Sequence, residues 1–281
     1  MKKLLLAATV LGAAGMYSPA LAADAAPAPE ESQVGFVGDI WGGYYFLGGS
    51  SGDADDSDNK GDFPSAGTDA SLIFGASDAF LLQLTGQGAL NFVGNADDDQ
   101  MELGWQIAAH AMHGSGIGVF GGYGGVDYDG NDSSNLWFAG AEYLHDFGSG
   151  DFLLQAGYLD SNLGSGTDTI ADAWFVRAAP SFNVSDSLGM GLHVGYADGD
   201  VDDPGENGYL VSWGASLDYA LESAPVTLFA AYDGFYVHSQ DASADEHQIK
   251  AGIRISLGGL ADKVIDTPEI FRWVGVSQRT D

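Results

Sequence analysis

The sequence predicts an all-β protein, an up-and-down antiparallel barrel of twelve strands that spans a membrane. Three observations lead to this fold class. Polar and apolar residues alternate with a period of two from about Val34 to Gly258, the alternating segments are even in number, and their connections are short and long in turn. With 45% hydrophobic residues, the chain is too apolar to be disordered, although its formal net charge is -31.

The first residues have the features of an export signal. Two lysines precede an apolar stretch from Leu4 to Met16, and Ala20-Leu21-Ala22 supplies small residues at the spacing of a cleavage site. We therefore expect a signal peptide at residues 1–22. The apolar stretch is shorter than the roughly 20 residues that a membrane-spanning helix needs, which disfavours an uncleaved anchor. Residues 23–33, rich in Ala, Pro and Glu, are typical of a flexible periplasmic leader.

Twelve segments after the leader are expected to form strands. No later stretch is apolar enough, over a sufficient length, to predict a transmembrane helix. The expected strands cover residues 34–48, 66–77, 79–93, 101–114, 117–129, 135–147, 151–163, 169–184, 188–200, 209–222, 226–239 and 247–258. Together they predict a single barrel domain over residues 34–260.

The alternation is clearest in the last segment. One face of that strand carries Ile249, Ala251, Ile253, Ile255 and Leu257, and the other carries Gln248, Lys250, Gly252, Arg254 and Ser256. Residues 209–222 and 80–92 repeat this pattern. Hydrocarbon cannot hydrogen-bond a free strand edge, so a spanning sheet must close on itself, with an apolar outer face.

The connections support a meander. Short turns, such as 114–116 and 148–150, alternate with longer acidic loops, such as 49–65 and 201–208. A soluble β-sandwich would also alternate, but it would want lysine and other charges on its outer face. The only basic residues between positions 33 and 260 are Lys60, Arg177, Lys250 and Arg254. The barrel is therefore favoured over the sandwich.

In this pattern, the sequence resembles the porin-like outer-membrane β-barrel proteins of Gram-negative bacteria. The resemblance covers nearly the whole mature chain and concerns the strand pattern, without a diagnostic motif. It implies an outer-membrane protein in contact with lipid and lipopolysaccharide, whose lumen passes small hydrophilic solutes or cations. Many members end on a C-terminal aromatic residue, whereas this chain continues for 21 residues after Leu260. We expect residues 261–281 to form a periplasmic extension, with both termini periplasmic; a plug and a thirteenth strand are the alternatives.

The polar faces of the strands carry a set of charges that would project into the lumen. The expected cluster comprises Asp39, Glu142, Arg177, Asp218, Asp233, Lys250 and Arg254. A final hairpin symmetric about residues 240–246 places Asp233 opposite Arg254. By the resemblance, such charges would create a transverse field across a pore. Alternatively, the acids and bases pair and close the barrel, because an unpaired charge away from water is costly. Many inward positions are small, for example Gly104 and Gly252, which favours a gap.

The long loops hold most of the acidic residues. Those expected at one mouth of the barrel include Asp53, Asp55, Asp56, Asp58, Asp97, Asp98, Asp99, Asp202 and Asp203. Their field should enrich cations. They could also bind divalent cations weakly, since hard cations prefer carboxylate oxygens, or form a solvated acidic surface. The run from Asp56 to Gly61 has a lysine where a calcium ligand belongs, which disfavours a specific calcium loop.

Other functional classes find little support. A pI near 4.1 without a basic run argues against nucleic-acid binding, and the absence of cysteine excludes a thiolate metal site and a cysteine nucleophile. No phosphate loop, nucleophile elbow or zinc motif occurs, so we expect no cofactor and no enzymatic activity. The six histidines keep open a barrel hydrolase with a Ser-His-Asp arrangement, and a closed structural or surface-recognition barrel is a further alternative.

Overall fold

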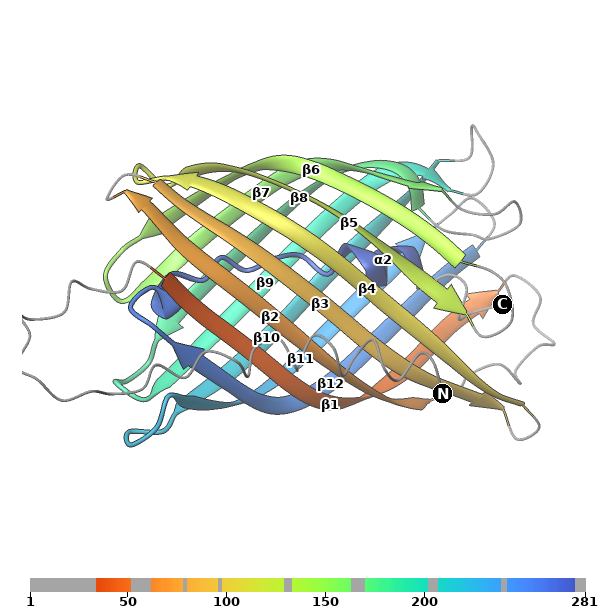
Figure 1. The fold of residues 1–281 in the computed structure, drawn as a ribbon. Helices are drawn as coiled ribbons and strands as arrows, with labels where there is room; N and C mark the ends of the chain where they lie inside the picture. Colours follow the sequence, from red (N-terminus) through yellow and green to blue (C-terminus); the bar gives the residue numbers. More distant parts are fainter. Residues whose placement is uncertain are drawn as a thin grey trace, which may run out of the picture. The chain divides into compact units, whose positions relative to one another are not determined.

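The computed structural model describes residues 34–51, 62–77, 80–95, 98–128, 133–162, 170–201, 207–238 and 242–275. In these ranges the chain forms a closed antiparallel barrel in which each strand pairs with its neighbours in sequence and β1 pairs with β12 (Figure 1). The predicted twelve-stranded meander is therefore confirmed. The expected signal peptide and leader lie outside the described residues.

Several strands are longer than the sequence pattern predicts, because main-chain pairing continues beyond the alternating residues into the expected loops. They are β1 (Val34–Ser51), β2 (Phe63–Ser77), β3 (Phe80–Asn95), β4 (Asp98–His113), β5 (Ile117–Tyr128), β6 (Ser133–Asp146), β7 (Gly150–Asn162), β8 (Ile170–Asn183), β9 (Leu188–Val201), β10 (Asn207–Ala220), β11 (Val226–His238) and β12 (Ala242–Leu257). A 3₁₀ turn, η1 (Ala261–Lys263), and a short helix, α2 (Ile270–Gly275), follow. Among the described residues, no helix is long and apolar enough to cross a membrane.

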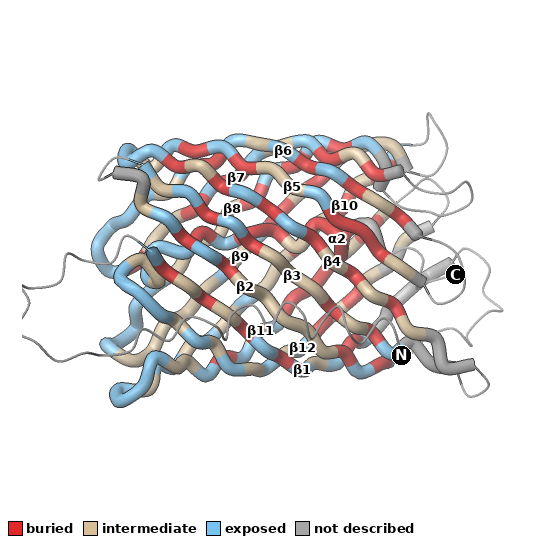
Figure 2. Tube along the Cα trace, in the orientation of Figure 1, coloured by how far each residue is buried: buried red, intermediate tan, exposed pale blue. Residues whose placement is uncertain are grey.

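Two differently solvated faces run along every strand, as the alternation predicts. Large apolar side chains stand exposed on the outside, for example Ile107 and Val119, while their sequence neighbours are buried inside. Figure 2 shows buried and exposed residues alternating along the strands. Exposure of such an extensive apolar outer face to water would cost much free energy. Contact of the same face with acyl chains would not. The outer surface is therefore that of a transmembrane β-barrel.

Replacing Ile107 with arginine should destabilise the barrel by about 2–4 kcal/mol, because this side chain lies in the middle of β4 and is 60% exposed on the outer face. The free energy of unfolding in lipid vesicles, from a denaturant titration, measures this cost. An Ile107→Val variant is the control. In a water-soluble barrel the arginine would change stability by less than about 0.5 kcal/mol, so a neutral result would contradict the membrane-spanning interpretation.

The register of the last hairpin differs from the prediction. Asp233 pairs with Gln248, and Arg254 pairs with Thr227 on β11. The expectation that Asp233 lies opposite Arg254 is wrong, because β12 begins at Ala242 and not near residue 247. On its other side, Arg254 lies directly opposite Asp39 of β1.

The segment after β12 runs inside the barrel (Figure 1). Ile265, Thr267, Ile270 and Trp273 are all buried, and α2 contacts β4, β5, β6 and β8. The expectation that residues 261–281 form an extension outside the barrel is therefore wrong for residues 264–273, which we call the tail. The physical reason is that the tail carries large apolar side chains, which the inward face of the strands can bury.

One half of the lumen is filled. We call the end of the barrel with the turns at 114–116, 147–149, 184–187 and 221–225 the short-turn end, and the other the loop end. Toward the loop end, inward residues such as Leu136, Leu159 and Leu210 are at most 1% exposed and form one apolar core with α2. The small inward residue Gly104 leaves little gap there, because it lies against the Phe271 ring. Nearer the short-turn end, Gly252 lies against the ring of Phe229.

Candidate functional site in the barrel lumen

All seven charged residues predicted to line the lumen lie on the inward faces of their strands. They do not form one cluster but fall into three groups, each described below. The first group is at the short-turn end. There the Arg254 guanidinium donates to both carboxylate oxygens of Asp39, at 3.0 Å from Nε and Nη2, and to Oδ1 of Asp218 at 2.7 Å. A third of the Arg254 side chain and a quarter of the Asp218 side chain remain exposed.

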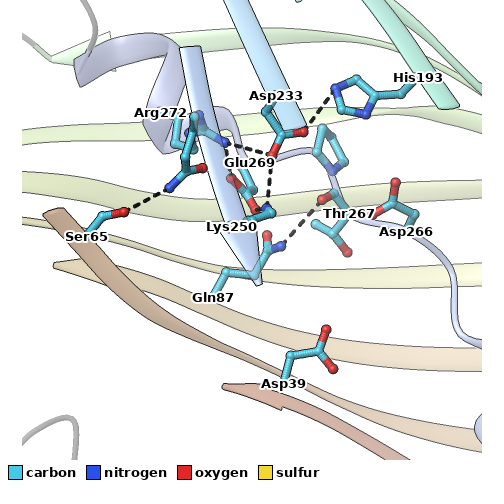
Figure 3. Close-up of polar contacts among 12 residues, drawn as sticks. Asp39, Ser65, Gln87, His193, Asp233, Lys250, Asp266, Thr267, Glu269 and Arg272 are labelled. Atoms are coloured by element: carbon cyan, nitrogen blue, oxygen red, sulfur yellow. Dashed lines mark hydrogen bonds and ion pairs between the residues drawn. The ribbon is translucent and has the colours of Figure 1, made fainter. Parts of the chain in front are cut away.

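The second group lies deeper in the lumen and joins the tail to the wall. Nζ of Lys250 lies 3.2 Å from Oδ2 of Asp233 and 3.0 Å from Oε1 of Glu269 in the tail. Figure 3 shows Asp233 between Lys250 and His193, whose Nε2 is 3.6 Å from Oδ1 of that carboxylate. Lys250 therefore links a wall residue to a tail residue.

Arg272 is the centre of the second group, although the sequence does not predict it there. Its guanidinium lies 2.9 Å from Glu269, 3.4 Å from Glu246 and 3.5 Å from Asp233. It also stacks over the ring of Phe235, at 4.4 Å from the centroid. The side chain is only 2% exposed, so this cation is compensated almost wholly by protein groups.

The pKa of Glu269 is controlled by this setting. Burial alone would raise the pKa of its carboxyl, but the Lys250 ammonium and the Arg272 guanidinium outweigh burial and hold the pKa below its usual range. Glu269 therefore stays ionised at neutral pH, and the tail keeps its ion pairs with the wall.

The third group holds the middle of the tail against β4, β6, β7 and β8. Arg177 pairs with Asp266 and donates to Gln155, which in turn donates to Glu142. Nδ1 of His110 lies 3.0 Å from Glu142, and its Nε2 lies 2.9 Å from the Thr267 hydroxyl. The predicted residues Arg177 and Glu142 are thus joined through a polar network that ends on the tail.

Glutamine side chains of the wall bind the main chain of the tail. Gln83 accepts from the Ile265 amide and donates to the Ile265 carbonyl, both at 2.7 Å. Gln155 donates to the Asp266 carbonyl at 3.1 Å, and Gln106 to the Pro268 carbonyl at 2.7 Å. Gln106 also accepts from the Phe271 amide at 3.2 Å. Because the wall supplies both donors and acceptors, the tail needs no strand partner to satisfy these main-chain groups.

The apolar part of the tail completes the core. Ile270, Phe271 and Trp273 are each at most 3% exposed, and the Trp273 ring meets the Phe175 ring edge-on with a centroid distance of 5.5 Å. Ile265 packs in a smaller cluster with Met112 and Leu153. Burial of four large side chains stabilises the docked tail by several kcal/mol, at about 1.5–3 kcal/mol each.

A valine at Gly104 should weaken tail docking, because a Cβ there would lie 2.4 Å from the Phe271 ring. Overpacking of this kind costs about 1–3 kcal/mol. Because the chain has no cysteine of its own, a Thr267→Cys substitution provides a single thiol as a reporter of tail release. Maleimide reacts with this thiol when the tail leaves the lumen, so the labelling rate measures how often the tail leaves. Labelling should be about tenfold faster with Gly104→Val. Gly86→Val is the matched control, because no heavy atom lies within 4 Å of a Cβ at Gly86, and an equal effect there would contradict the assignment.

Most of the acidic residues predicted at the barrel mouth lie outside the described residues. These are Asp53, Asp55, Asp56, Asp58, Asp97, Asp202 and Asp203. Asp98 and Asp99 begin β4, and Asp98 pairs with Asn95. In the described part of the chain, no group of three His, Asp or Glu side chains is arranged to hold a metal ion. Weak binding of divalent cations at the loops stays a prediction.

Comparison with known proteins supports the fold and no closer relationship. No family model matches the chain, and no curated protein matches it. An outer membrane channel from Pseudomonas putida F1 is 8% identical, with a TM-score of 0.53, over 83% of this chain and all of that one. The translocator domain of the autotransporter NalP from Neisseria meningitidis is 11% identical, with a TM-score of 0.49, over 90% of this chain and 94% of that one. At 8% identity, the similarity to the Pseudomonas channel shows the fold alone, which is that of an outer-membrane β-barrel.

Proposed function

We propose that this protein is a porin-like channel of the outer membrane, through which small hydrophilic solutes diffuse passively and cations pass preferentially. The observation that carries this proposal is a charged, water-accessible lumen wall inside an apolar outer surface. Arg254, Asp218 and His193 keep 33%, 25% and 21% of their side chains exposed. A purely structural barrel of this kind would have no reason to keep charges in contact with water on its inner wall.

The cation preference is inferred from the balance of charge. In the described lumen, the basic groups are Arg177, Lys250, Arg254 and Arg272, whereas acidic groups include Asp39, Asp69, Glu102, Glu142, Asp218, Asp233, Glu246, Asp266 and Glu269. An excess of carboxylates raises the local concentration of cations and opposes the entry of anions. The acidic loop residues would add to this field if they gather at the mouth.

The docked tail is part of the proposal, because α2 and the core around it fill the loop-end half of the lumen. Passage therefore requires a state in which the tail has left. Much of the docking consists of hydrogen bonds and ion pairs, which water can replace when the tail leaves. We infer that the docked tail is the closed state of the channel.

Currents through the full-length protein in planar bilayers test this proposal. In a variant with His110→Cys and Thr267→Cys, a short bifunctional thiol reagent with a disulfide in its spacer can crosslink the tail to the wall. The crosslinked channel should be closed. Reduction of the spacer disulfide should restore the current. A tenfold potassium chloride gradient should give a reversal potential of the sign expected for cation selectivity. Absence of current before crosslinking and after reduction, or clear anion selectivity, would contradict the proposal.

The proposed orientation has both ends of the barrel sequence on the periplasmic side and the acidic loops at the cell surface. Divalent cations could then bridge the loop carboxylates to lipopolysaccharide phosphates. A protease added to intact cells should cut an epitope inserted at residues 202–206 and spare one inserted at Gly259. The opposite pattern would reverse the orientation.

The hydrolase alternative has one observation in its favour. Thr267, His110 and Glu142 are connected in the order of a nucleophile, a base and an orienting carboxylate. Their exposed fractions are only 1–4%, so a substrate has no access to the hydroxyl while the tail is docked. We therefore favour a docking role. Covalent labelling of Thr267 by a fluorophosphonate probe would reverse this preference.

A further inference from the structure

The inner wall of β3, β4 and β7 holds a run of four successive tail residues through their main chain. Gln83 binds Ile265 at both its amide and its carbonyl, Gln155 binds the carbonyl of Asp266, and Gln106 binds that of Pro268. Gln87 lies 3.5 Å from the carbonyl of Thr267 (Figure 3). Tail residues 264–269 form neither helix nor strand, and the wall supplies main-chain partners for Ile265, Asp266 and Thr267. The Pro268 carbonyl accepts from the Ile270 amide as well as from Gln106.

These glutamines are built into the wall. Gln83, Gln106 and Gln155 are at most 1% exposed, and each is also fixed by a second wall residue: Gln83 donates to Thr85, Gln106 to Gln87, and Gln155 to Glu142. Their amides are thus oriented before a tail is present. When the tail is absent, water or another main chain must take up these hydrogen bonds, and a second peptide would reproduce them in the same geometry.

Three further contacts select the side chains of what binds. Arg177 pairs with the carboxylate of Asp266, His110 bonds the hydroxyl of Thr267, and Lys250 pairs with the carboxylate of Glu269. An apolar cluster receives the side chain of Ile265 before this sequence, and the core receives α2 after it. The wall therefore distinguishes an apolar-Asp-Thr-Pro-Glu order from other peptides of similar composition.

We propose that this wall is a peptide-binding site of which the tail is a tethered, replaceable ligand. Its ligand class is an extended acidic peptide that carries a carboxylate, a hydroxyl and a second carboxylate in the order of Asp266, Thr267 and Glu269. Such a peptide, supplied in trans, binds where the tail binds. The inference does not depend on the proposed channel, because the site is defined by contacts and not by passage.

The test uses the full chain with a specific protease site inserted between Gly259 and Leu260, which is cut after the protein has folded in detergent. The probe is a synthetic peptide of residues 261–275 with an N-terminal fluorophore. Fluorescence anisotropy should show saturable binding to the cut protein, displaced by unlabelled peptide. The uncut protein should bind far less, because a tethered tail competes at a millimolar effective concentration.

Variants of the probe keep the test independent of barrel folding. A peptide with Asp266→Asn and Thr267→Ala should bind about tenfold more weakly or worse, since it loses a charged and a neutral hydrogen bond. A peptide with the same composition in scrambled order should not compete. On the wall, Gln83→Leu should weaken binding of the natural probe by about tenfold, whereas Leu84→Ala, on the outer face of the same strand, should not.

Two results would overturn the inference. One is equal binding of the scrambled peptide, which would mean that apolar burial alone holds the tail. The other is failure of the probe to take the place of the cut tail. In that case millimolar probe does not displace the cut tail, or the barrel binds no probe after mass spectrometry shows that the tail has left. Currents are not measured in this test, so its failure and a failure of the channel proposal are separate outcomes.

Discussion

Arg272→Met should release the tail from the lumen. The substitution removes the cation that Glu269, Glu246 and Asp233 share, but keeps most of the side-chain volume. Loss of one partner from a buried ionic network costs about 3–5 kcal/mol, because the three carboxylates lose their shared cation and Lys250 is left to compensate both Glu269 and Asp233. Maleimide labelling of the Thr267→Cys reporter should therefore be at least about a hundredfold faster than in the parent. Channel currents should rise in parallel if the tail closes the pore.

A second substitution tests the electrostatic cause. The Arg272→Met/Glu269→Gln double variant removes one of the three carboxylates that lost this cation, so labelling should be slower than in Arg272→Met alone. Partial recovery of this kind is expected when a charge imbalance, and not lost packing, drives release. If the double variant were labelled faster still, the explanation of the Arg272 effect by unpaired acids would be wrong.

Trp273→Ala should release the tail by a different route. The Trp273 ring is 3% exposed and packs edge-on against Phe175 in the core that α2 completes. Truncation of a buried tryptophan to alanine costs about 3–5 kcal/mol, through lost transfer free energy and the cavity that remains. The same cysteine reporter should show labelling at least about a hundredfold faster.

The control for this substitution is Trp174→Ala, one residue before Phe175 in β8. Trp174 is 52% exposed on the outer face, so its loss should leave reporter labelling within a few-fold of the parent. Equal acceleration by both substitutions would indicate general loosening of the barrel. Unchanged labelling in Trp273→Ala would mean that α2 does not anchor the tail.

The barrel could be predicted from the sequence because a strand in a closed sheet has only two faces. The period of two in residues such as Ile249 to Leu257 determines which side chains meet lipid, and the structure places them outside. Register is less well determined by this period. The outward positions at the start of β12 are Ser243, Asp245 and His247, so the apolar alternation begins only at Ile249 and does not mark the start of the strand. The centre of the last hairpin is therefore predicted too late.

The tail could not be placed by strand periodicity, because residues 264–269 have no regular structure and most of their contacts with the wall come from residues that are far away in the sequence. Two signals nevertheless point to a filled lumen. Inward aromatic residues such as Phe120, Phe138 and Phe175 interrupt the polar face of their strands. Ile270, Phe271 and Trp273 make the segment after the barrel more apolar than a solvated extension would be. The glutamines of the wall carried no signal, since an inward amide is compatible with an aqueous pore.

The measurement that tests the account most directly is spin-label accessibility in lipid vesicles, with single labels at Ile107, on the outer face, and at Thr267, in the tail. Oxygen, which partitions into the bilayer, should relax the Ile107 label, while a water-soluble nickel complex should not. The Thr267 label should be protected from the nickel complex and become accessible to it when Arg272→Met is added. Nickel access at Ile107, or free nickel access at Thr267 in the parent protein, would contradict a membrane-spanning barrel with its tail docked inside.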